Sequence, residues 1–232
     1  MKWESYVGLF GLLLLVIGHG LGLFWAPPEA MMGEVGRILY AHVPTAWVAL
    51  VTYLVAFVAA IGTMWSGKLR WDALVEAAVE VGVLLNAMLL FQGSMWAKPT
   101  WGVYWTWDPR LTTTAIMVLT FIGVLVLRSL VSVPRKRMMT SAAATILAFV
   151  NVPIVYFSIK WWRTLHQPFS SPETVDSPMV LPLRISAFAM LFISICFITK
   201  RWRIATARLE REDWAPELPP QPERLNIGEE RQ

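Results

Sequence analysis

Two histidines and a run of aromatic residues are the side chains of this sequence best suited to chemistry. His42 stands in Tyr40-Ala-His-Val-Pro-Thr-Ala-Trp47 and His166 in Trp161-Trp-Arg-Thr-Leu-His-Gln-Pro168. Four Trp and one Tyr lie between them, within residues 96–107. Neutral imidazole is a common metal ligand, and aromatic rings stack on flat apolar molecules. These residue types indicate that a ligand is bound.

The aromatic segment reads Met95-Trp-Ala-Lys-Pro-Thr-Trp-Gly-Val-Tyr-Trp-Thr-Trp-Asp-Pro-Arg110. Trp and Tyr also collect at membrane interfaces, and such a belt would explain an isolated residue such as Trp65. It explains this segment less well, because Pro99, Gly102 and Pro109 predict a shaped re-entrant or surface-lying loop, not a helix end. Offset stacking stabilises by about 0.5 to 1.5 kcal/mol beyond area burial. A flat ligand such as a porphyrin would therefore suit this segment.

The two histidines could bind the iron of such a porphyrin from both sides. Two axial imidazoles would leave no position for oxygen or a substrate, so the site would hold heme without using it. Each histidine taken alone is also compatible with a hydrogen-bonded structural role. Four cations that we expect on the same side of the membrane as the histidines are available for the propionates, or else for lipid headgroups: Lys98, Arg110, Arg163 and Arg184.

Asp108 has three open roles at the end of the aromatic segment. It could pair with Arg110, orient the loop through backbone hydrogen bonds, or support a histidine from behind. We expect its role to be structural.

The composition places these residues in a membrane protein. The 232 residues are 56% hydrophobic and 16% charged, and the mean hydropathy is +0.52. The apolar residues form blocks of about 20, the length that a helix needs to cross the hydrocarbon core. No small-residue cleavage site follows the first block, so we expect it to be retained. We predict an all-α polytopic protein with six transmembrane helices at roughly residues 5–26, 39–65, 72–95, 111–128, 140–159 and 181–199.

The basic residues predict the orientation. With the N-terminus inside, 14 of the 20 Lys and Arg residues fall in inner segments, so both termini are expected in the cytoplasm. This topology places His42, the aromatic segment and His166 together on the outer face. Residues 1–200 would form the transmembrane domain. Residues 201–232 are expected to form a mobile cytoplasmic tail, because its Pro-rich stretch at 216–222 cannot be helical.

Several classes of function are disfavoured by what the sequence contains. The single cysteine, Cys196, permits no intramolecular disulfide, and without a Cys-x-x-Cys-His motif the chain is not a c-type cytochrome. The pI near 9.4 does not indicate nucleic-acid binding, because the basic residues stand at the ends of spans. No Gly-rich phosphate loop is visible, so any ATP would be hydrolysed by a partner.

Three segments resemble a known family. Trp101-Gly-Val-Tyr-Trp-Thr-Trp-Asp-Pro-Arg-Leu-Thr112 resembles the tryptophan-rich WWD signature of heme-handling proteins, specifically the CcmC family. The segments 37–44 and 161–168 resemble the two histidine-bearing segments of that family, and the likeness covers about residues 30–200. Tyr104 departs from the pattern, since members often have Trp there, but tyrosine still offers a stacking face. Six spans suit this family better than the larger WWD proteins, which would attach heme to apocytochromes.

The resemblance implies a site and a set of partners. His42 and His166 would be the axial ligands of heme b, and the cofactor would also contact Trp96, Trp101, Tyr104, Trp105, Trp107, Asp108 and Arg110. The protein would lie in the bacterial inner membrane with its active face in the periplasm. It would act in cytochrome c biogenesis as a heme-handling component and not as an enzyme, and it would deliver heme to the chaperone CcmE. CcmD and the transporter subunits CcmA and CcmB would be its neighbours in a CcmABCD complex, in which CcmA uses ATP.

Two other functions stay open. Translocation of heme across the bilayer would need a path of polar residues through the interior of the spans. The sequence offers few candidates for such a path beyond Glu76, Glu80, Asn86 and His19. A membrane enzyme for lipid-linked substrates would use Asp108 and the outer cations, and it would purify without a Soret band. Glu76 and Glu80, one helical turn apart, could pair within the bundle or contact a membrane partner. His19 is expected to be structural.

Overall fold

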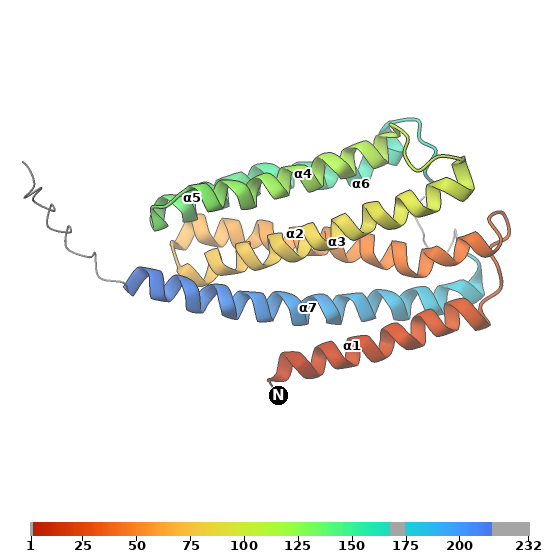
Figure 1. The fold of residues 1–232 in the computed structure, drawn as a ribbon, viewed down its shortest axis with the longest axis horizontal. Helices are drawn as coiled ribbons and strands as arrows, with labels where there is room; N and C mark the ends of the chain where they lie inside the picture. Colours follow the sequence, from red (N-terminus) through yellow and green to blue (C-terminus); the bar gives the residue numbers. More distant parts are fainter. Residues whose placement is uncertain (1, 168–174, 215–232) are drawn as a thin grey trace, which may run out of the picture.

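Six long apolar helices run side by side in the computed structural model, which describes residues 2–167 and 175–214 (Figure 1). No β-strand occurs in these two ranges. The predicted all-α fold with six membrane-crossing helices is therefore confirmed. The elements are α1 (Trp3–Gly20) with its π-helical end η1 (Leu21–Trp25), the 3-10 turn η2 (Glu34–Ile38), α2 (Leu39–Ser66), α3 (Leu69–Trp101), α4 (Pro109–Leu130), α5 (Pro134–Phe149), α6 (Asn151–Trp161) and α7 (Ser177–Trp214).

The helices α2 and α3 form the centre of the bundle. On one side α7 packs against both and carries α1 on its other face, and on the opposite side lie α4, α5 and α6 (Figure 1). The largest buried cluster lies between the central pair and α4, α5 and α6. Within it the Tyr53 and Phe121 rings stack with their centroids 3.8 Å apart. This packing joins the first half of the chain to the second.

The described parts of the loops that follow α1, α3 and α6 lie at one end of the bundle, which we call the loop end (right in Figure 1). The beginning of α1 and the end of α7 lie at the opposite end. The three segments that we expected to share one face thus lie together. The side of the membrane that the loop end faces stays a prediction.

The helix α3 is longer than predicted and takes in the first half of the aromatic segment. It ends at Trp101, where Gly102 adopts a left-handed φ of 79° and accepts a hydrogen bond from Lys98 Nζ at 2.9 Å. A glycine in this conformation is a common helix terminator. Pro99 lies inside the last turn, where it removes one N–H donor without ending the helix. The expectation that residues 96–101 belong to an irregular loop was therefore wrong.

The helix α7 also continues past the predicted end of the last span at residue 199. Trp202, Ala205 and Leu209 follow one another at helical spacing and pack against Ala73 of α3. The helix thus continues through residues 201–214 and packs on the bundle as far as Leu209, so the tail that we predicted from residue 201 does not begin there. Residues 215–232, with the Pro-rich stretch, lie outside the described residues.

The remaining differences concern the fifth and first spans. The fifth, predicted as one helix over residues 140–159, is divided into α5 and α6 at Val150. Pro153 accounts for the break, because it has no N–H to donate to the carbonyl four residues earlier. In the first span, the last turn is π-helical, and Arg37 Nη1 donates to the Gly22 and Ala26 carbonyls at 2.6 and 3.0 Å. Arg37 thereby ties the end of α1 to the start of α2.

A glycine on α3 allows the closest approach of the central helices. A Cβ at Gly82 would lie 2.6 Å from Tyr53 Cε1, and the stacked Tyr53 ring has no room to retreat. We expect Gly82→Ala to lower the free energy of unfolding in detergent by about 1 to 3 kcal/mol. Gly123→Ala on α4 is the control, since a Cβ there meets no atom within 4 Å and its stability should be unchanged or slightly raised. Equal effects of the two substitutions would contradict this account.

Candidate functional site

A cavity opens at the loop end between α2, α3, α4 and α6. It encloses about 960 Å³ of space between its atoms, including the part open to the outside. Mostly apolar walls with a few convergent polar groups are typical of small-molecule sites. The lining residues include His42, Val43, Trp47, Leu50, Leu89, Leu90, Gly93, Trp96, Trp101, Trp105, Arg110, Leu111, Tyr156, Ile159 and His166.

His42 lies in the first turns of α2 and is 8% exposed. Its Nδ1 is buried and has no hydrogen-bond partner among the described residues. Gly93 of α3 makes room for the ring, since a Cβ there would lie 3.3 Å from His42 Cε1. Buried polar atoms without a partner are rare in folded proteins and need an explanation. Because Nδ1 has almost no accessible surface, the other ring nitrogen of His42, Nε2, is the one available to a ligand in the cavity that this residue lines.

His166 enters the cavity wall from the loop that follows α6. Its Nδ1 lies 2.9 Å from the Gln167 carbonyl, which only accepts, so Nδ1 carries the proton and Nε2 keeps its lone pair. Burial lowers the pKa of the His166 imidazole, and so does the nearby positive charge of Arg110. The hydrogen bond to Gln167 raises this pKa, but the lowering effects prevail. The ring is therefore neutral at neutral pH, which is the form that binds a metal.

The Trp96 indole lies close to the rings of both histidines. Its ring centroid lies 5.9 Å from that of His42 and 6.3 Å from that of His166, perpendicular to the latter. Trp96 is 6% exposed and stands on α3, in the turns that the sequence had placed in a loop. The helical extension of α3 is thus what places this ring in the site.

The structure separates the predicted aromatic platform into two groups. Trp101 and Trp105 line the cavity with Trp96, whereas Tyr104 and Trp107 do not. Trp107 is 82% exposed and meets Trp105 edge-on, at 5.9 Å between centroids. Tyr104 is 53% exposed, with Lys98 Nζ 5.4 Å from its ring centre. The cavity brings together six of the predicted site residues: His42, Trp96, Trp101, Trp105, Arg110 and His166.

The charged residues of the aromatic segment also differ in position. Arg110 lines the cavity, and its Nη1 donates to the Val155 and Tyr156 carbonyls of α6 at 2.9 and 3.3 Å. Asp108 lies outside the cavity wall, where its Oδ1 accepts from the Arg110 backbone N–H at 2.9 Å and caps α4. The other three predicted cations also lie outside this wall: Lys98, Arg163 and Arg184.

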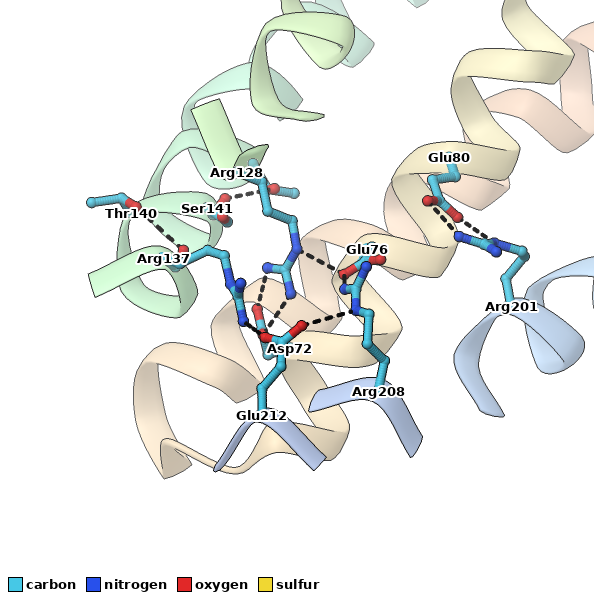
Figure 2. A network of polar contacts seen from close by, with 11 residues as sticks. Asp72, Glu76, Glu80, Arg128, Arg137, Thr140, Ser141, Arg201, Arg208 and Glu212 are labelled. Atoms are coloured by element: carbon cyan, nitrogen blue, oxygen red, sulfur yellow. Dashed lines mark hydrogen bonds and ion pairs between the residues drawn. The ribbon is translucent and has the colours of Figure 1, made fainter. Parts of the chain in front are cut away.

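A second polar centre lies at the opposite end of the bundle, which we call the charged end, and only its two glutamates were identified from the sequence, not Asp72 or the arginine partners (Figure 2). Arg128 of α4 donates to both oxygens of Asp72 at 2.6 and 2.7 Å and to Glu76 at 2.8 Å. Arg208 of α7 binds the same Glu76 oxygen at 2.5 Å. Charged side chains in spans usually pair inside the bundle, and this rule was the available signal.

The charged end also settles the open question about the two glutamates of α3. Glu76 pairs with Arg128 and Arg208, and Glu80 accepts from Arg201 at 2.5 and 2.7 Å (Figure 2). Both are therefore paired within the bundle. Since these groups satisfy one another, they do not form an open polar path at this end.

The fold and the cavity define a class: a six-helix membrane protein whose loop end holds two histidines in an aromatic wall. Residues 1–216 match the family model of CcmC, heme exporter protein C. The chain belongs to this family, as its sequence motifs indicated.

Three curated relatives carry the same family name. The heme exporter protein C of Bradyrhizobium diazoefficiens is 34% identical over 204 residues, which are 84% of this chain and 77% of the relative. That of Escherichia coli K12 is 32% identical over 216 residues, 92% of this chain and 88% of the relative. That of Haemophilus influenzae is 35% identical over 211 residues, 88% and 84% of the two chains.

Proposed function

We propose that this protein holds heme b in the cavity at its loop end, with His42 and His166 as axial ligands, and hands it on during cytochrome c maturation. Membership of the heme exporter protein C family supports a role in heme handling for cytochrome c biogenesis. The observation that carries the finer proposal is that two histidines from distant parts of the sequence line one aromatic cavity.

The donor atoms of the cavity fit an iron porphyrin. His42 lines the cavity with its imidazole, and His166 offers the lone pair of Nε2. Residues 2–167 and 175–214 contain no group of three or more His, Cys, Asp and Glu side chains that could hold a bare metal ion. Iron would therefore have to arrive with most of its ligands. When bound, the heme would supply an iron whose two axial positions are both filled, so it would be stored and not used.

The other cavity residues would hold and shield the cofactor. Trp96, Trp101 and Trp105 offer apolar faces that stack on the porphyrin and exclude water. Arg110 contributes a positive charge to the wall, which suits propionate carboxylates. Tyr104 and Trp107 would contact heme only after the loop moves, and their exposed rings are available to a receiving protein.

The family resemblance extends this proposal to location and partners. The loop end would face the periplasm of a bacterial inner membrane, because 14 of the 20 basic residues fall in the predicted inner segments. The receiving protein would be the chaperone CcmE, with CcmD, CcmA and CcmB as neighbours.

The visible spectrum of the purified protein tests the proposal. We expect protein purified in mild detergent, with heme supplied, to show the Soret and visible bands of six-coordinate low-spin heme. A sample that takes up no specific heme under these conditions would overturn the proposal and favour an enzyme for lipid-linked substrates.

A further inference from the structure

Asp108 joins two parts of the loop end with one carboxylate. It is 6% exposed, and both of its oxygens accept hydrogen bonds. Oδ1 accepts from the Arg110 backbone N–H at the start of α4. Oδ2 accepts from the Thr164 hydroxyl and from the Leu165 backbone N–H, both at 2.7 Å. The start of α4 is thereby bonded to the segment that precedes His166.

The hydrogen bonds continue from Asp108 to His166 itself. The Thr164 hydroxyl, whose proton is directed at Asp108, accepts the His166 backbone N–H at 3.0 Å. The His166 ring is in turn oriented by the hydrogen bond between its Nδ1 and the Gln167 carbonyl. The segment has no helical structure, and Leu165 is 60% exposed, so apolar packing fixes it only weakly. Its position therefore depends on these hydrogen bonds.

Only a carboxylate can serve both sides of this junction. Among the described residues, three donors face Asp108, and an asparagine would turn its NH₂ group toward at least one of them. Hydrogen bonds to an ionised acceptor are roughly twice as strong as neutral ones. A negative charge is also favoured at the N-terminus of α4 by the helix dipole.

We propose that Asp108 is a positioning residue that holds His166 in place as a heme ligand, an inference that rests on the proposed function. Asp108 does not line the cavity, so it acts through His166 and not by contact with the cofactor. This differs from the role that the family resemblance implies, in which Asp108 contacts heme.

The test compares Asp108→Asn with two substitutions of Thr164, of which valine removes the hydroxyl and serine keeps it. We expect Asp108→Asn and Thr164→Val to convert the six-coordinate low-spin spectrum to a five-coordinate one, with His42 as the remaining axial ligand. Their heme affinity should fall roughly 10- to 100-fold, as is usual when a residue that orients a metal ligand is lost. Thr164→Ser keeps the hydroxyl and should keep the wild-type spectrum, which shows that the loss is not a general unfolding of the loop.

Two further measurements separate positioning from direct contact. Imidazole added to Asp108→Asn should restore the six-coordinate spectrum, because only the placement of the second ligand is lost. The double variant Asp108→Asn/His166→Ala should bind heme as His166→Ala does. A wild-type spectrum in Asp108→Asn would overturn the inference and leave the proposed function standing. The same holds if the losses of heme affinity in the two single variants add up in the double variant. Absence of the low-spin spectrum in the wild type would instead overturn the proposed function.

Discussion

Replacing His42 with alanine is expected to abolish six-coordinate heme binding and to weaken heme retention roughly 100-fold or more, about 2.7 kcal/mol. His42 is held in a helix and is 8% exposed, and the described wall of the cavity contains no His, Cys or Met besides His42 and His166 that could replace it as a ligand. His166→Ala should also remove the low-spin spectrum. The measurement is heme titration followed by visible absorption, with circular dichroism to confirm that the helices are intact.

The third histidine of the chain is the matched control. His19 lies on α1, where its Nδ1 lies 3.1 Å from the Leu15 carbonyl of the same helix, and it does not line the cavity. His19→Ala should therefore bind heme as the wild type does. If His42→Ala and His166→Ala both kept the wild-type spectrum, the assignment of axial ligands would be wrong.

The sequence predicts the six spans because apolar blocks report directly on membrane crossing, but it predicts helix ends poorly. Hydropathy follows the part of a helix that contacts lipid, whereas the ends depend on local geometry and on partners. α3 ends only at Trp101, where the following Gly102 adopts a left-handed conformation. α7 extends to Trp214, and packing on α3 and ion pairs accompany the extension. Neither end lies in a continuous apolar block of the kind that marks a span.

The residue types of the site are visible in the sequence, but their orientation is not. The cavity wall includes Trp105, while Trp107 two residues later is 82% exposed. The direction of each ring depends on where α3 ends and how the loop returns to α4. The role of Asp108 likewise depends on Thr164 and Leu165, which lie more than 50 positions away in the chain. Such partners are found only when the helices are assembled.

The partners at the charged end are just as distant in the sequence. Arg128 is separated from Glu76 by 52 positions and from Asp72 by 56. The sequence shows that acidic residues in α3 need partners, but it does not show which of several arginines supplies them. Helix packing decides this, because α3 and α4 are neighbours and Arg128 of α4 reaches Asp72 and Glu76 of α3 (Figure 2).

Replacing Arg128 with methionine is expected to lower the free energy of unfolding by about 3 to 5 kcal/mol. The side chains of Arg128, Asp72 and Glu76 are only 7%, 2% and 5% exposed. A buried ion pair as a whole adds little stability, because desolvation offsets the attraction, but removing one partner leaves a buried charge without compensation. Asp72 would lose both hydrogen bonds that Arg128 donates, whereas Glu76 would keep Arg208 (Figure 2). Thermal or denaturant unfolding in detergent measures the effect.

Two further variants show whether the uncompensated charge is the cause. Adding Asp72→Asn to Arg128→Met should recover a large part of the lost stability, because the second substitution removes the unpaired carboxylate. Arg201→Met should lower the free energy of unfolding by no more than about 1 kcal/mol. The side chains of its ion pair, Arg201 and Glu80, are 40% and 29% exposed, and exposed pairs contribute little to stability. If the double variant is as unstable as Arg128→Met alone, the loss comes from packing of the arginine side chain and not from the charge left on Asp72.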